Sequence, residues 1–129
     1  MGRFESYVFE NGAWADTATG LTWLGISIHD SSFATVGYSL SADEFGVFYL
    51  GYQPRDYFDA PDDHEATNCA AEAAGVSRWA SIVLSADVDP ARIEALMAPE
   101  SVEEPLDVFV EDTVLRLLTL LGLPKPDDL

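Results

Sequence analysis

The fold is decided by the stretch YVFENGAWA at residues 7–15. Asn11-Gly12 within it is the strongest two-residue signal for a hairpin, because a type I′ turn needs positive φ at both central positions. Tyr7-Val8-Phe9 therefore predicts one strand, and Ala13-Trp14-Ala15 predicts the strand that returns antiparallel to it. The N-terminal half is expected to be built from hairpins of this kind.

Three more strands are predicted between this hairpin and residue 61. Leu21 to His29 alternates between the two sides of a strand, and the turn at residues 30–32 leads into Phe33 to Leu40. The next turn, at residues 41–44, precedes Phe45 to Tyr52. Short strands joined by tight turns predict an antiparallel meander of four to five strands, with one face packed and the other wet or covered.

The periodicity becomes helical after Pro61. Apolar or small residues recur at spacings i, i+3, i+4, i+7 and i+8, which predicts an amphipathic helix that Gly75 can end. Asp62 and Asp63 would lie at its start, where carboxylates favour the helix dipole. Trp79 to Leu84 fits either a short buried strand or more helix. The predicted buried stripe consists of Ala66, Cys69, Ala70, Ala73 and Ala74.

Two further helices are predicted downstream. Asp89 is placed to cap the first and Pro90 occupies its first position, while Pro99 stops it. The second runs from Leu106 to Leu121, and Gly122 ends it. Its apolar positions fall on one broad face, which consists of Leu106, Val110, Val114, Leu117, Leu118 and Leu121.

Strands first and helices second predict an α+β fold, with the C-terminal helices packed on one face of the N-terminal sheet. The chain has 129 residues, which fits a single domain over residues 1–129, mainly β over 1–58 and mainly α over 61–122. Hydrophobic residues make up 48% of the chain, so it can bury a core and its acidity does not indicate disorder.

The charge restricts the classes of partner. Asp and Glu number 23 against six Lys and Arg, which gives a formal net charge of −17. Nucleic acids and anionic membranes are bound through Lys and Arg clusters, so neither is an expected partner, whereas a basic protein is. No apolar run is long enough for a membrane span or a signal peptide, which predicts a cytoplasmic protein. The alanine-rich, lysine-poor composition is typical of a high-GC bacterial source.

The residues that could support catalysis or metal binding lack the necessary spacing. Zinc needs paired Cys and His ligands, but only Cys69, His29 and His64 are present. The acidic stretch Asp59 to Glu65 lacks the ligand pattern of a calcium loop. Neither a G-x-S-x-G elbow nor an S-x-x-K pair occurs. We therefore predict no catalytic residues, no metal and no cofactor, and a function other than catalysis.

Two acidic runs remain as the candidate binding surface. In the first run the acids lie beside Tyr57 and Phe58, and aromatic rings next to carboxylates suit an interface with a basic partner. The alternative is that both rings belong to the core and that the acids surround a solvated helix start. The predicted partner-binding residues are Asp56, Tyr57, Asp59, Asp62, Asp63, Glu65, Glu100, Glu103 and Glu104.

In size, charge and order of elements the chain resembles the immunity proteins of bacterial polymorphic toxin systems, and among them the type 1 family. The resemblance is carried by the N-terminal strands, the acidic loop, and the Leu-rich helix that precedes a short Pro-containing tail. It implies a cytoplasmic, stoichiometric inhibitor that binds and blocks a basic toxin or another protein that acts on nucleic acid. The acids of residues 56–65 would then dock on the partner's basic cleft.

Two other function classes fit the sequence. The first is a subunit of a larger assembly, in which exposed apolar residues on the Leu106–Leu121 helix would mark the contact. The second is a small ligand-binding or minor enzymatic domain with a cavity between sheet and helices, into which His29 would project. The residues expected to line that cavity are Trp14, Trp23, Tyr38 and Tyr49. The sequence predicts no particular oligomeric state.

Overall fold

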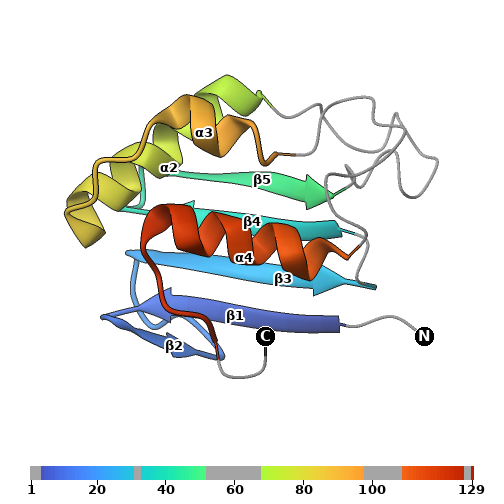
Figure 1. Ribbon diagram of the computed structural model, residues 1–129. Helices are drawn as coiled ribbons and strands as arrows, with labels where there is room; N and C mark the ends of the chain where they lie inside the picture. The colour runs from blue at the N-terminus through green and yellow to red at the C-terminus, as the bar shows by residue number, and fades with distance from the viewer. Residues whose placement is uncertain (1–3, 31–32, 52–67, 98–108, 127–128) are drawn as a thin grey trace.

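The computed structural model describes residues 4–30, 33–51, 68–97, 109–126 and 129. Within them the chain forms a five-stranded antiparallel sheet, and all three helices lie on the same face of that sheet (Figure 1). The predicted α+β fold, with N-terminal strands and C-terminal helices on one face, is confirmed.

All five predicted strands form in the predicted order along the chain, but β2 rather than β1 lies at the edge of the sheet. They are β1 (Phe4–Glu10), β2 (Ala13–Ala15), β3 (Trp23–His29), β4 (Phe33–Ser39) and β5 (Phe45–Gly51). Asn11 and Gly12 have φ values of 56° and 82°, as the type I′ turn requires. The spatial order is β2-β1-β3-β4-β5, so β3 returns to the other side of β1 and leaves β2 at the edge.

The helices are α2 (Cys69–Leu84), α3 (Pro90–Glu94) and α4 (Val110–Leu121). The Asp89 side chain caps α3 by accepting from the Ala91 amide, as predicted from Asp89-Pro90. Gly122 ends α4 in the left-handed conformation with a φ of 79°, also as predicted. Ala66, Pro99 and the first residues of the predicted last helix lie outside the described residues.

Helix α2 differs from its prediction in both its end and its buried face. It continues past Gly75 to Leu84, so the ambiguous stretch Trp79–Leu84 is helix. Its start is capped by Asn68, whose side chain accepts from the Ala71 amide. Ala70 and Ala74, both predicted to be buried, are exposed. The residues that α2 buries are Ala73, Val76, Trp79 and Ala80.

The face of α2 was mispredicted because alanine occurs on nearly every side of this helix. Larger apolar side chains bury more surface, so Val76 and Trp79 decide which side packs on the sheet. Gly75 fits inside the helix because the Tyr38 hydroxyl occupies the space in which a Cβ would lie. The glycine therefore marks a close approach of strand β4 to the helix rather than a helix end.

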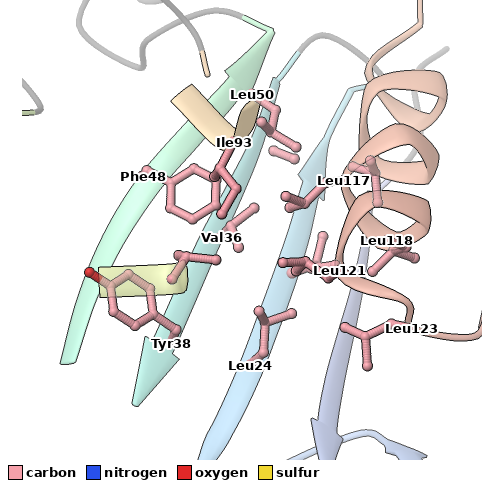
Figure 2. Packing of buried hydrophobic residues seen from close by; sticks show 14 of the residues in the cluster. Leu24, Val36, Tyr38, Phe48, Leu50, Ile93, Leu117, Leu118, Leu121 and Leu123 are labelled. Carbon is pink, nitrogen blue, oxygen red and sulfur yellow. The ribbon is translucent and has the colours of Figure 1, made fainter. Parts of the chain in front are cut away.

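The core lies between the sheet and the helices (Figure 2). Tyr7, Ile26, Val36 and Phe48 form one row across four strands on the helical side of the sheet. Ile93 of α3 and three leucines of α4 point down onto this surface, and all four are buried. These leucines, all predicted for the apolar face, are Leu117, Leu118 and Leu121.

Candidate functional site

The predicted partner-binding residues lie outside the part of the chain that the structure describes. This holds for Asp56, Tyr57, Asp59, Asp62, Asp63, Glu65, Glu100, Glu103 and Glu104. The binding surface predicted from these residues therefore stays a prediction.

The described residues offer one broad candidate, which we call the outer sheet face. It is the side of the sheet turned away from α2, α3 and α4, and no described helix or strand covers it (Figure 1). Because side chains alternate along a strand, the register assigns every second residue to it. Its members are Ser6, Val8, Glu10, Ala13, Ala15, Trp23, Gly25, Ser27, His29, Phe33, Thr35, Gly37, Ser39, Phe45, Val47, Tyr49 and Gly51.

Large apolar side chains of the outer sheet face reach solvent. Phe45 is 69% exposed and Val47 is 41% exposed, while Trp23 and Tyr49 are half-buried. The open side of an antiparallel sheet is normally polar. An apolar patch with a polar rim instead marks a surface that binds something.

The Trp23 indole packs on the outer sheet face over two glycines. A Cβ on Gly25 would come within 3.4 Å of the indole Cζ3, and a Cβ on Gly37 within 3.3 Å. Gly25 and Gly37 pair directly across β3 and β4, so together they form a shallow trough for the ring. The side chain is therefore held against the backbone while part of the indole remains exposed.

The outer sheet face is nearly free of charge. Of the described acids only Glu10 lies on it, and no described Lys or Arg does. The Glu10 carboxylate accepts from the Thr19 amide at 2.9 Å, the Thr19 hydroxyl at 2.8 Å and the Gly20 amide at 2.7 Å. These hydrogen bonds lower the pKa of Glu10 and hold its charge at the margin of the sheet.

Glu10→Gln is expected to lower stability at pH 7 but not in strong acid. Because the pKa of Glu10 is lowered in the folded protein, its carboxylate contributes stability above an unfolded pKa of about 4.3. That contribution is lost as the pH falls through the folded value. Urea midpoints at pH 7 and pH 3 test this, with Asp87→Asn as a control for the same charge change. An equal effect of Glu10→Gln at both pH values would contradict it.

Acids surround the outer sheet face at the strand ends. Asp16 follows β2, Asp30 lies in the turn after β3, and Asp43 lies in the turn after β4. The neighbouring Glu44 turns instead toward α2, where its carboxylate pairs with Arg78 at 2.8 Å and has a lowered pKa. The outer sheet face thus carries apolar and aromatic side chains, and described acids lie at its margin.

The predicted cavity between sheet and helices is not formed by the residues named for it. Trp14 and Tyr38 lie on the helical side, whereas Trp23 and Tyr49 lie on the outer sheet face, so the four cannot line one space. The Tyr38 hydroxyl donates to Glu72 at 2.8 Å, and the Trp14 indole donates to the Pro124 carbonyl at 2.8 Å. His29 stacks on Phe33, 4.9 Å between ring centroids, on the outer side.

Surface hollows also occur among the described residues. One, of about 720 Å³, lies between α3 and α4 and is lined in part by Leu115 and Leu120, both half-buried. Leu115 and Leu120 are the apolar side chains of α4 that remain partly accessible, which is the feature on which the assembly hypothesis depends. Another, of about 360 Å³, lies beside Trp14 at the edge of the sheet.

No three His, Cys, Asp or Glu side chains among the described residues come together as metal ligands. None of the described helices combines the length and the apolar character needed to cross a membrane. Neither models of known protein families nor curated proteins nor solved structures give a significant match to the chain.

The sequence of β5 contains a pattern that could have indicated the outer sheet face. Residues 45–50 read Phe-Gly-Val-Phe-Tyr-Leu, so both sides of β5 carry apolar side chains. A strand that is apolar on both sides is typical of a sheet covered on both faces. In this chain the described helices cover only one face, so Phe45 and Val47 on the other face are exposed. Neither residue was predicted as part of a binding site.

Proposed function

We propose that the chain is a protein-binding domain, an immunity-type stoichiometric inhibitor that docks its outer sheet face on a basic protein and blocks it. The proposal rests on one observation: a neutral aromatic sheet face, surrounded by acids, in a chain of net charge −17. The partner class includes toxin domains and other proteins that act on nucleic acid.

The composition of the outer sheet face supports a protein as the partner. The centres of protein interfaces are depleted of charged residues and enriched in aromatic ones, while their rims are polar. Trp and Tyr are also the residues that most often contribute large shares of binding energy. Trp23 lies on the central strand β3, with its ring over Gly25 and Gly37, and Tyr49 lies on the edge strand β5.

The acidic margin supports a basic partner. Asp16, Asp30 and Asp43 would meet Lys and Arg side chains placed around an apolar patch on the partner. The net charge of −17 would also accelerate encounter with a positively charged protein, by 10- to 1,000-fold in favourable cases of this kind. The predicted acids of residues 56–65 would add to this steering.

Trp23→Ser and Phe45→Ser are each expected to weaken the complex by about 30-fold or more, since buried aromatic residues commonly contribute 2 kcal/mol or more. Wild type and both variants serve as baits for capture from native lysate, and affinities for the captured protein follow by calorimetry. Ile82→Ser is the matched control, because Ile82 is 55% exposed on α2, away from the outer sheet face.

The supporting result is a 1:1 complex that wild type and Ile82→Ser retain and that both outer-face variants lose. Asp16→Asn and Asp43→Asn should slow association and reduce its dependence on salt, with little change in dissociation. Equal capture by all baits would remove the outer sheet face from the interface. A concentration-dependent homodimer that Trp23→Ser disrupts would assign the face to a second copy and contradict the proposal.

A further inference from the structure

The two edges of the sheet differ in length and in protection. Strand β2 forms one edge and has three residues, whereas β5 forms the other edge and has seven. Proteins usually protect a long edge with lysine, proline or a bulge, because its unpaired backbone groups can pair with other strands. Strand β5 contains no charged residue and no proline, and its pairing with β4 is continuous from end to end. Among the described strands, β5 is therefore the edge that is open to pairing.

The pairing of β4 with β5 shows which backbone groups of β5 face away from the sheet. The Leu40 amide donates to the Glu44 carbonyl at 2.8 Å, directly before Phe45 begins the paired part of β5. Hydrogen-bonded and non-hydrogen-bonded pairs alternate along an antiparallel ladder. Phe45, Val47 and Tyr49 are therefore the residues whose N–H and C=O groups point away from β4. Within the described part of the chain, no further backbone group bonds to them.

The same three residues also belong to the outer sheet face. The side chains of Phe45 and Val47 are exposed, and that of Tyr49 is half-buried. The outward backbone groups recur at every second residue, so only an extended chain can pair with them in series. Such a chain would lie beside β5 and would extend the outer sheet face past its present edge.

We infer that the partner adds one of its own strands to β5, an inference that rests on the proposed function. Main-chain hydrogen bonds give affinity in this mode of binding, while alternate side chains of the added strand give specificity. Charge favours a strand of a basic protein over a second copy of this chain, because two copies would bring together two net charges of −17. Asp43, exposed in the turn before β5, would meet a Lys or Arg at that end of the added strand.

A seven-residue peptide with blocked ends, in which Arg and Val alternate, is the probe for this edge and matches β5 in length. Its control has the same sequence and charge but carries N-methyl groups on two adjacent central residues, which prevent strand pairing along both sides of the peptide. Titration of the Arg–Val peptide into the whole protein should shift the NMR signals of the Val47 and Tyr49 amides to saturation. It should bind about 5-fold or more tightly than the control, which lacks main-chain hydrogen bonds. Equal affinity of the two peptides would overturn the inference.

Val47→Pro removes an outward N–H without removing a hydrogen bond to β4, and proline is tolerated on edge strands for this reason. Val47→Thr is the matched control, because it keeps both the N–H and the β-branched shape. Val47→Pro should weaken binding of the Arg–Val peptide by about 5-fold or more, while Val47→Thr should not. A folded Val47→Pro variant that binds the peptide like wild type would contradict strand addition. If Val47→Pro does not fold, the N-methylated peptide still decides the question on the wild-type protein.

Amide hydrogen exchange in the complex with the captured partner separates this inference from the proposed function. The Val47 and Tyr49 amides should exchange rapidly in the free protein and about 10-fold or more slowly in the complex. If they stay rapid while Trp23→Ser abolishes binding, strand addition alone is wrong. If they become slow while Trp23→Ser binds like wild type, the proposed docking face is wrong and strand addition stands.

Slow exchange together with loss of binding in Trp23→Ser supports both. Rapid exchange together with wild-type binding by Trp23→Ser contradicts both. A concentration-dependent homodimer of the wild type that Val47→Pro abolishes would assign the β5 edge to a second copy and overturn the inference.

Discussion

Replacing Gly75 with alanine is expected to destabilise the protein by about 3 kcal/mol, although alanine is ordinarily the better helix residue by about 1 kcal/mol. Gly75 lies inside α2, and a Cβ there would overlap the hydroxyl oxygen of Tyr38. Tyr38 cannot easily move aside, because it is buried and its hydroxyl donates to Glu72 at 2.8 Å. Overlap with this fixed group therefore outweighs the gain in helix propensity.

The contact has a second glycine on its strand side. A Cβ on Gly46 of β5 would overlap both the Glu72 carboxylate and the Tyr38 hydroxyl, so the pair is enclosed by two residues without side chains. Burial, followed by the neighbouring Glu72 carboxylate, raises the pKa of Tyr38 and keeps the hydroxyl protonated as the donor. Gly46→Ala is expected to destabilise in the same direction as Gly75→Ala.

Urea unfolding of Gly75→Ala, with Ala74→Gly as the control, tests this contact. Ala74 is the exposed neighbour on the same helix, so its change to glycine should cost only the propensity difference of about 1 kcal/mol. Adding Tyr38→Phe to Gly75→Ala should restore part of the lost stability, because the overlapping oxygen is gone. A Gly75→Ala variant as stable as wild type would show that Tyr38 does not occupy this position.

Trp79→Ala is expected to cost about 3–5 kcal/mol, the usual range for removing a fully buried large aromatic residue. Trp79 has no exposed surface, and its side chain fills the space between α2 and the end of β4. Its indole nitrogen also donates to the Ser39 carbonyl at 3.2 Å. Domains of this kind have a total stability of about 5–15 kcal/mol, so the variant should lie near the limit of folding.

Two further variants, Trp79→Phe and Trp23→Ala, show how much of the stability lost in Trp79→Ala is due to burial in the core. Trp79→Phe keeps most of the apolar volume but leaves the Ser39 carbonyl without its donor, so we expect a smaller loss, of about 1–3 kcal/mol. Trp23→Ala removes the half-buried tryptophan of the outer sheet face and should cost clearly less than Trp79→Ala. Equal losses for Trp79→Ala and Trp23→Ala would place both tryptophans in the core.

The sequence predicts local elements of this chain better than it predicts how they are arranged. Asn11-Gly12 specifies its turn through backbone conformation alone, and the Asp89-Pro90 pair specifies a helix start in the same way. Both signals act over two to four residues, so they hold whatever surrounds them. The edge position of β2 depends instead on which side of β1 the later strand β3 joins, and no local signal decides that.

The candidate site was missed for a related reason. Whether Trp23 shares a face with Tyr38 or with Tyr49 depends on the register of β3, β4 and β5, because a shift of one residue reverses every side chain. The predicted cavity between sheet and helices assumed that all four aromatic residues share one face, which the register does not allow. The two-sided apolar pattern of residues 45–50 was visible in the sequence, but its meaning depended on knowing which face the helices cover.

The distance along the chain between the sheet and its covering helix has a consequence for synthesis of the protein. The ribosome makes all five strands before α4, and about 70 residues separate Gly51 from Leu121. At 5–20 residues per second this interval lasts about 4 to 14 seconds. During it the sheet lacks the leucines that cover its inner row, so a newly made chain exposes apolar strands on both faces. Such chains are prone to associate with one another, and a general chaperone that binds nascent chains should raise the yield of folded protein.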